Sequence, residues 1–287
     1  MFMQENKLNL RLRMDRINSL LLGAGIIILF LSGCNKKDEG QLVITGNVNL
    51  LTDRTISSTV LNQTMKYNII LPNDYYLNTE NYYPVLYLFH GMGGNNNDWA
   101  DYGSAKQTVQ DAIKNETIPP MIVVMPDAFN TFYVDGYQNG LKYETYFWDE
   151  FLPYIEENYR INATRETRFI AGFSMGGFGA SYYAFTYPDK FTYCYSMSGA
   201  VEGVGSPTTP SISSIISAYD SFSELPDYML DCGTSDPLVY ESNQSVHDSL
   251  NSLGFNHEYI AREGTHDWVF WTKSLEMALE RIGQYLN

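Results

Sequence analysis

The amino-acid sequence predicts an α/β fold, with a doubly wound, mostly parallel sheet and helices on both faces. Short apolar runs recur along the chain, as expected of strands whose two faces are both covered. Segments with helical periodicity separate these runs, which is typical of parallel strands joined by crossover helices. About 245 residues follow position 40, enough for one large α/β domain without disulfide staples.

The predicted elements begin at residues 56–71, where polar and apolar residues alternate as in antiparallel strands that open a sheet. Further strands are predicted at 84–89, 121–125, 168–173, 191–197, 228–230 and 257–261. Helices are predicted at 104–114, 144–158, 175–187, 241–253 and 269–285. Ligands bind such sheets at the carboxyl ends of the strands, so functional residues are expected there.

Residues 201–227 interrupt this pattern, because they are rich in Ser, Pro and Thr and hold one short helical piece. An insertion between core strands at the active end often forms a wall or lid of a pocket. A passive surface loop is the equal alternative.

Residues 1–33 are predicted to be a lipoprotein signal peptide. Basic residues precede an apolar run at 20–31, and about a dozen residues are too few for the roughly 20 of a membrane span. The run ends in LSGC, which resembles the lipobox of bacterial lipoproteins and makes Cys34 the lipid acceptor, unless the cysteine is there by chance. Residues 34–40 are then a lipidated linker and 41–287 the domain. This arrangement predicts an outer-membrane lipoprotein that faces the periplasm or the exterior.

The charge of the chain excludes one class of partner. The net charge is −15, and residues 1–33 carry four basic and two acidic side chains, so the mature chain is near −17. A nucleic-acid-binding protein needs a basic surface, so no nucleic acid is expected. Cys194 and Cys232 could pair in an oxidising compartment. We expect instead two buried thiols on separate strands.

Residues 172–176, GFSMG, match the G-x-S-x-G pattern of a nucleophile elbow. They follow a predicted strand and open a predicted helix, which is the junction that such an elbow needs. At a helix N-terminus the dipole and the free N–H groups favour developing negative charge. This context predicts that Ser174 is a nucleophile rather than a surface serine in a glycine-rich turn.

A serine hydroxyl needs a base to act as a nucleophile near neutral pH. His266 follows the last predicted strand and precedes the final helix, where an α/β enzyme would hold its base. His247 and His257 are expected to be surface or boundary residues, and His90 to belong to another part of the site. The base needs an acid to fix its tautomer.

Asp236 is the favoured acid, because it lies in the loop that follows the strand at 228–230. The order Ser174, Asp236, His266 is the one found in α/β-hydrolases. Asp231 is the alternative, although it stands at the end of the strand, whereas Asp236 is far enough into the loop to reach over.

Residues 90–94, HGMGG, follow the apolar run at 84–89. A glycine-rich backbone there is able to turn its N–H groups toward the site and supply half of an oxyanion hole. The N–H of Met175, which follows the nucleophile, would supply the other half. The alternative is an ordinary tight turn.

Four blocks resemble the esterase-D-like group of carbohydrate esterases, which holds feruloyl esterases, acetyl xylan esterases and mycolyltransferases. They are LFHGMGGNNNDW (88–99), GFSMGGFGA (172–180), DCGTSD (231–236) and GTHDWVFW (264–271), and together they span nearly the whole mature chain. The resemblance implies an α/β-hydrolase fold with Ser174, Asp236 and His266 as the triad. It also implies an oxyanion hole from the amides of Met92 and Met175. The implied activity is cleavage of ester side groups from plant cell-wall polysaccharide.

Trp99, Trp268 and Trp271 lie close in sequence to the candidate oxyanion-hole and base residues, so we expect them to line the substrate pocket. Aromatic side chains offer large apolar contact area to a flat phenolic acid such as ferulate. The alternative is that they pack the core. Feruloyl esterase is therefore the preferred activity, and acetyl xylan esterase is the alternative within the same family.

Two other classes are weighed, an acyltransferase and a non-catalytic sugar-binding lipoprotein. The presence of all three triad residue types argues against the second. No cofactor or metal is expected, because the histidines lack ligand spacing and the thiols are far apart. The expected partner is a small-molecule or polysaccharide ester, with membrane contact through the lipid anchor alone.

Overall fold

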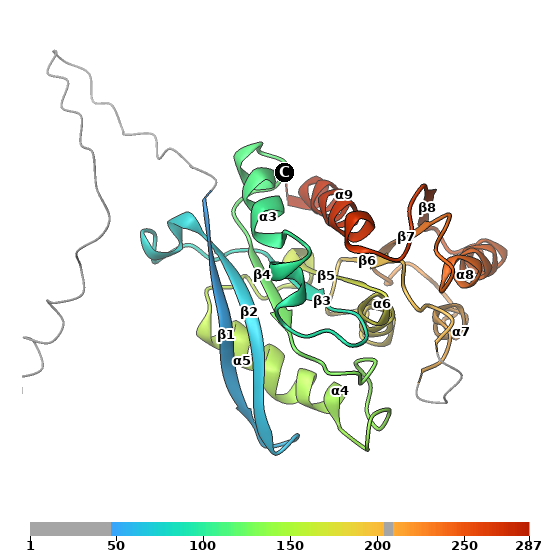
Figure 1. The fold of residues 1–287 in the computed structure, drawn as a ribbon, viewed down its shortest axis with the longest axis horizontal. Coiled ribbons are helices and arrows are strands. Elements are labelled where there is room, and N and C mark those ends of the chain that lie inside the picture. Colours follow the sequence, from blue (N-terminus) through green and yellow to red (C-terminus); the bar gives the residue numbers. More distant parts are fainter. Residues whose placement is uncertain (1–46, 204–208, 287) are drawn as a thin grey trace, which may run out of the picture. The chain divides into compact units, whose positions relative to one another are not determined.

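The computed structural model describes residues 47–203 and 209–286, and the described residues form a sheet of 8 strands with helices on both faces (Figure 1). The predicted signal peptide, Cys34 and the linker after it lie outside the described residues.

The strand order is β1-β2-β4-β3-β5-β6-β7-β8. β1 pairs with β2 and β2 with β4 in antiparallel fashion, and the remaining neighbours are parallel. The strands are β1 (Val48–Ser58), β2 (Gln63–Pro72), β3 (Val85–Phe89), β4 (Ile122–Pro126), β5 (Arg168–Phe173), β6 (Tyr193–Met197), β7 (Asp227–Gly233) and β8 (Glu258–Arg262).

The helices largely follow the predicted periodicity. They are η1 (Asn73–Tyr76), α2 (Asp98–Asp101), α3 (Ala105–Lys114), α4 (Tyr143–Tyr146), η2 (Phe147–Phe151), α5 (Leu152–Asn158), η3 (Arg165–Thr167), α6 (Met175–Thr186), α7 (Ile212–Ile216), α8 (Tyr240–Leu253) and α9 (Trp268–Leu286). The single helix predicted at 144–158 is divided, because a π-helical turn, η2, separates α4 from α5. Pro153 follows directly, and its missing N–H interrupts the regular hydrogen-bond ladder there.

The antiparallel opening of the sheet is confirmed, but its first strand begins at Val48 rather than at residue 56. β1 is an edge strand whose middle residues are mostly exposed, so it lacks the apolar alternation that marked the rest. The pairing with β2 also shifts register between Leu51 and Arg54, where Asp53 has φ 48°. This bulge breaks the period of two on which the prediction depended.

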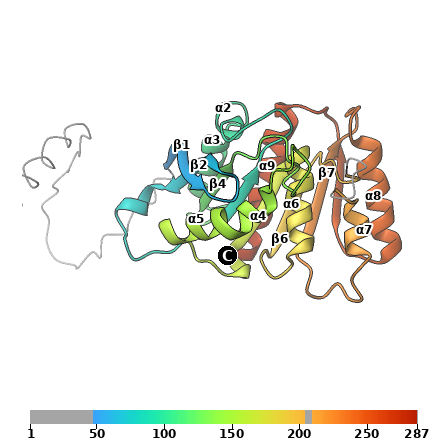
Figure 2. The ribbon, with the colours of Figure 1, turned by 90° about the horizontal axis from the view of Figure 1, so that it is seen from below.

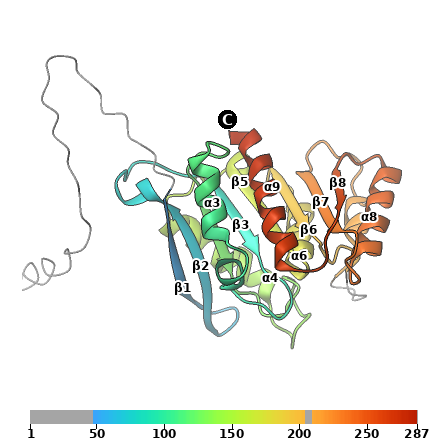
Figure 3. The same cartoon turned by 45° about the horizontal axis from the view of Figure 1, so that its top comes forward.

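The parallel strands carry the core. Every residue of β3, β4, β5 and β6 is buried, which explains why the sequence showed unbroken apolar runs. α3 and α9 lie side by side across one face of the sheet (Figure 3). α4, α5, α6 and α7 lie along the other face (Figure 2). The doubly wound arrangement predicted from the sequence is therefore confirmed.

Three further features bear on the predictions. Cys194 and Cys232 are both buried and free, so the prediction of two separate thiols is confirmed.

In the interruption at 201–227, α7 buries Ile212 and Ile216 against neighbouring helices, while residues 204–208 lie outside the described residues. Among residues 47–203 and 209–286, no helix is both long and apolar enough to cross a membrane.

Candidate active site

The turn between β5 and α6 holds Ser174 in a strained conformation, with φ 53° and ψ −118°. Its N–H donates to the carbonyl oxygen of Met197 at 3.0 Å, which ties the turn to β6. The flanking glycines have no room for a side chain: a Cβ on Gly172 would lie 2.4 Å from the oxygen of Gly176. A Cβ on Gly176 would lie 2.5 Å from the oxygen of His90. The spacing of the sequence motif thus reflects steric contacts in a sharp turn.

His266 lies in the loop after β8, and its side chain contacts Ser174 in this turn. The distance between His266 Nε2 and Ser174 Oγ is 2.9 Å, and His266 Nδ1 lies 2.6 Å from Asp236 Oδ2. An ionised carboxylate only accepts hydrogen bonds, so Nδ1 carries the proton and donates to Asp236. Nε2 is then bare and accepts the hydroxyl proton of Ser174. The imidazole is held in the tautomer that is able to remove that proton.

Asp236 has both carboxylate oxygens engaged. Oδ2 accepts from His266, and Oδ1 accepts from the N–H groups of Leu238 at 3.0 Å and Val239 at 3.2 Å. Burial acts to raise the pKa of Asp236, but the hydrogen bonds from His266 and from these amides outweigh it and lower the pKa overall. The loop after β7 therefore keeps this side chain ionised beside the imidazole.

Asp231, the alternative acid, faces a different group. It is fully buried at the end of β7, where its Oδ2 accepts from Arg262 at 2.9 Å and from the hydroxyl of Ser274 at 2.6 Å. Burial raises the pKa of Asp231 against the lowering effect of these two partners. The structure thus brings Asp236, and not Asp231, to His266.

Two backbone amides, those of Met175 and Met92, are the predicted donors of the oxyanion hole. Met175 is the first residue of α6, and Met92 lies in the glycine-rich turn after β3. Met92 is 56% exposed, so its side chain contributes little to packing, and the predicted role of this residue depends on its backbone N–H. The adjacent N–H of Gly93 donates to Asn130 Oδ1 at 2.6 Å and is therefore not available to a ligand.

The side chain of His90 links the turn after β3 to the segment that follows β4. It is buried, its Nε2 accepts from the N–H of Ala128 at 2.8 Å, and its Nδ1 donates to the oxygen of Gly91 at 2.7 Å. Burial lowers the pKa of His90, which favours the neutral form that this bonding requires.

The two remaining histidines lie away from the site, as predicted. His247 Nδ1 and His257 Nε2 are 2.8 Å apart, and these residues join α8 to the start of β8.

A cavity of about 390 Å³ lies between the turn after β3 and the start of α9, and Phe173, the residue before Ser174, is part of its lining. Its lining residues are Met92, Gly93, Gly94, Asn95, Asn97, Asp98, Asp101, Tyr102, Phe173, Trp268 and Trp271. Trp271 also meets the ring of His266 edge-on, with centroids 4.9 Å apart, so the cavity adjoins the imidazole. Trp268 and Trp271 therefore line a cavity at the position predicted for them.

The prediction for Trp99 is wrong. Trp99 is 1% exposed and lies behind the wall, where it packs edge-on against Phe173 and Trp268. Its Nε1–H donates to the oxygen of Phe89 at 3.0 Å. Closeness in sequence to the turn at 90–94 says nothing about direction, and on the short helix α2 this side chain points into the core.

The sequence analysis missed Phe173, Tyr102 and Asp98 as lining residues. Phe173 was visible as the variable residue of the G-x-S-x-G pattern but was counted only as the end of a strand. Of the two alternatives for 201–227, a pocket wall or a passive surface loop, the described residues 201–203 and 209–227 give no support to the first at this cavity, because none of them lines it.

Among the residues that the structure describes, no three His, Cys, Asp or Glu side chains gather in a way that could hold a metal ion.

The parallel sheet with helices on both faces, and a serine raised on a sharp strand-to-helix turn, define the α/β-hydrolase class. Residues 58–282 match the family described as "Putative esterase", so this chain belongs to that esterase family.

The chain is similar to a ferulic acid esterase of known structure. The two are 31% identical, the match covers 83% of this chain and 98% of that one, and the TM-score is 0.77. An acetyl esterase of Caldicellulosiruptor saccharolyticus is 26% identical over 225 residues, which cover 68% of this chain and 82% of the relative. An endo-1,4-beta-xylanase/feruloyl esterase of Xylanibacter ruminicola is 29% identical over 204 residues, or 70% of this chain. The chain spans only 26–28% of the length of several curated relatives, the Xylanibacter enzyme among them.

Proposed function

We propose that this protein is a serine carboxylesterase with Ser174 as nucleophile, His266 as general base and Asp236 as the acid that orients it. The observation that carries the proposal is the continuous hydrogen-bonded chain from Ser174 Oγ through the imidazole to the Asp236 carboxylate, at 2.9 and 2.6 Å. Membership of an esterase family supports the same reaction.

The reaction follows from these contacts. Ser174 Oγ attacks the ester carbonyl carbon while His266 Nε2 takes its proton, and the N–H groups of Met92 and Met175 donate to the oxygen that becomes negative. His266 then gives the proton to the departing alcohol, which leaves an acyl group on Ser174. Water repeats the sequence, with His266 as base, and releases the carboxylic acid.

The proposed substrates are ester side groups of plant cell-wall polysaccharide, and feruloyl esters in particular. The aromatic residues of the cavity support this choice, because the exposed Tyr102 and the partly exposed Trp268 offer flat apolar surface to a phenolic ring. The similarity to a ferulic acid esterase over most of both chains points the same way.

The test compares methyl ferulate with methyl acetate, since both release the same unactivated alcohol. A higher kcat/KM on methyl ferulate is expected, and Trp268→Ala should narrow the difference between the two esters. Val269→Ala serves as the matched control, because Val269 follows Trp268 on α9, is exposed, and does not line the cavity. A clear preference for acetylated xylan, with ferulate esters cleaved poorly, would contradict the feruloyl assignment.

An acetyl xylan esterase is the second candidate, which the similarity to an acetyl esterase along 82% of its length favours. The similarity to a ferulic acid esterase is the greater, at 31% identity along 98% of that chain, so the feruloyl activity comes first. An assay with added sugar acceptors separates both from an acyltransferase, which would transfer the acyl group to the sugar rather than to water.

The proposal extends to the location of the protein, a bacterial outer-membrane lipoprotein anchored through Cys34. It is supported by the basic segment, the short apolar run and the LSGC sequence that ends it. In a native-type host the protein should partition with membranes, and Cys34→Ala should release it or block its processing. Wild-type protein found entirely in the soluble fraction would contradict the anchor.

A further inference from the structure

The turn that carries Met92 is made largely of glycine, at positions 91, 93 and 94, so its backbone has unusual freedom. A donor in an oxyanion hole is effective only if it is already aimed at the developing charge. The contacts that hold this turn therefore bear directly on the reaction proposed above.

Two of those contacts are local. The Nδ1–H of His90 and the N–H of Gly94 both donate to the oxygen of Gly91, at 2.7 and 3.2 Å. Both fix the base of the turn and leave its outer side, where Gly93 has φ +79°, unrestrained. The side-chain contact on that outer side comes from another segment, the 2.6 Å hydrogen bond from the Gly93 N–H to Asn130 Oδ1.

Asn130 is presented by a strained loop. Three non-glycine residues around it, Phe129, Phe132 and Tyr133, have φ between 51° and 63°. Positive φ is unfavourable for large aromatic residues and persists only where the surroundings impose it. Strained backbone is more frequent at functional sites than elsewhere. The contacts that this loop makes with its neighbours are therefore candidates for a functional role.

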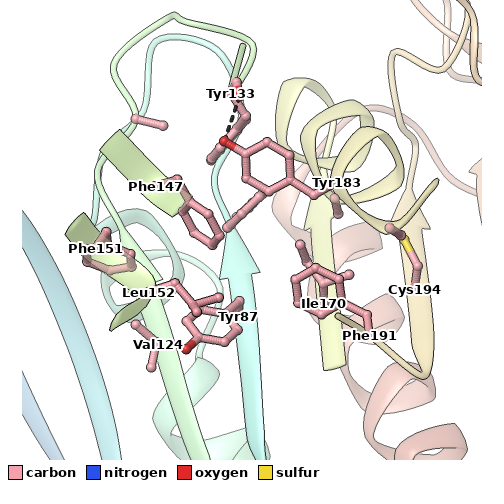
Figure 4. Packing of buried hydrophobic residues seen from close by; sticks show 14 of the residues in the cluster. Tyr87, Val124, Tyr133, Phe147, Phe151, Leu152, Ile170, Tyr183, Phe191 and Cys194 are labelled. Carbon is pink, nitrogen blue, oxygen red and sulfur yellow. Dashed lines mark hydrogen bonds between the residues drawn. The ribbon is translucent and has the colours of Figure 1, made fainter. Parts of the chain in front are cut away.

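The loop is held from several sides. Thr131 Oγ1 donates to the oxygen of Ala128 at 2.7 Å, and the hydroxyl of Tyr133 donates to the oxygen of His90 at 3.0 Å. Figure 4 shows Tyr133 in the buried cluster, with the hydroxyl of Tyr183 donating to its carbonyl oxygen at 2.7 Å. These bonds join the loop to α6 and to the end of β3, the elements that flank the candidate oxyanion hole.

The backbone of Asn130 is fixed as well, because its N–H donates to Gln138 Oε1 at 2.9 Å. The side chain thus reaches Gly93 from a residue whose own main chain is restrained. The bond to the Gly93 N–H fixes the peptide plane between Met92 and Gly93. It thereby restricts the backbone of Met92, whose own N–H lies in the preceding peptide plane.

We propose that Asn130 is a positioning residue that aims the N–H of Met92 into the oxyanion hole through its bond to Gly93. The inference rests on the proposed serine esterase function. Asn130 acts on the transition state, where the oxygen is charged, and contributes little to binding of the neutral ester.

Asn130→Ala is the test. Loss of an oxyanion-hole donor costs about 10²–10³ in rate, and a misdirected donor should cost part of that, about 10- to 100-fold in kcat with KM nearly unchanged. The inhibition constant of phenylboronic acid, whose adduct with a serine is tetrahedral, should rise by a similar factor. Gln138→Ala, which frees the backbone of Asn130, should act in the same direction but less.

Asn139→Gly is the matched control, because Asn139 is exposed in the same loop, has φ 50°, and makes no side-chain contact with the turn. It should leave kcat and boronate inhibition unchanged. Full kcat in Asn130→Ala, or a loss confined to KM, would overturn the inference. So would a fall in kcat with undiminished boronate affinity.

Failure of the proposed function would be visible separately. In that case the wild-type protein would neither be labelled by a fluorophosphonate nor be inhibited by the boronic acid. A labelled wild-type enzyme together with an unaffected Asn130→Ala variant would reject the role of Asn130 alone.

Discussion

Two aspartates close in sequence, Asp231 within β7 and Asp236 in the loop after it, have different roles. Asp231 is bound by Arg262 and Ser274, so its carboxylate links the sheet to α9. Asp236 lies in the loop beyond, where amides of the same loop hold one oxygen and His266 takes the other. Because the two residues are of the same type and are close in sequence, the role of each carboxylate is set by its hydrogen-bond partners.

The largest expected effect is that of Asp236→Asn. The amide would no longer stabilise the imidazolium or select the tautomer that accepts from Ser174, so kcat should fall by about 10³–10⁴. Steady-state kinetics on methyl ferulate measures this, with thermal unfolding to verify the fold. A variant that keeps more than about a tenth of the wild-type kcat would remove Asp236 from the triad.

The matched change, Asp231→Asn, should affect stability instead. It leaves the buried side of Arg262 without its carboxylate, and breaking such a pair costs about 3 kcal/mol in the free energy of unfolding. Urea unfolding measures the loss, and kcat of the folded protein should stay within a few-fold of wild type. If kcat fell as far as in Asp236→Asn, the division of roles between the two residues would be wrong.

A smaller effect concerns pH. The pKa of Asp236 is lowered in the folded protein, so its ionised form contributes stability above the unfolded pKa of about 3.9, and this is lost as the pH falls through the folded value. The difference in unfolding free energy between wild type and Asp236→Asn should therefore hold steady from pH 8 to about 4 and shrink below that.

For Asp231 the sign is reversed, because burial raises its pKa. Its ionised form is disfavoured in the folded state. The free energy of unfolding of the wild type should therefore rise relative to that of Asp231→Asn as the pH falls toward 4. Unfolding curves of the three proteins at a series of pH values measure both trends. Equal pH dependence of the two variants would show that the two carboxylates do not differ as described.

The fold was largely predictable, because strands that are buried on both faces appear in the sequence as unbroken apolar runs. β1 escaped prediction because an edge strand with a bulge has no such run. The three groups Ser174, Asp236 and His266 were predictable as neighbours, since each lies in the turn or loop after a predicted strand and parallel strands end at one edge.

Direction and long-range partners were not predictable. Trp99 and Trp268 each lie within a few residues of a predicted site residue, yet Trp99 faces the core and Trp268 lines the cavity. The contact between Asn130 and Gly93 joins residues 37 positions apart. It depends on positive φ at Phe129, Phe132 and Tyr133, a conformation that is uncommon for aromatic residues and that the sequence does not predict.

The most direct test of the account is a measurement of where, and how fast, a fluorophosphonate reacts with the protein. We expect one adduct per chain, located on Ser174 by peptide mass spectrometry, with the rate reduced by orders of magnitude in Asp236→Asn and nearly unchanged in Asp231→Asn. Absence of labelling, labelling at another residue, or equal rates in the two variants would contradict the assignment of Ser174, His266 and Asp236.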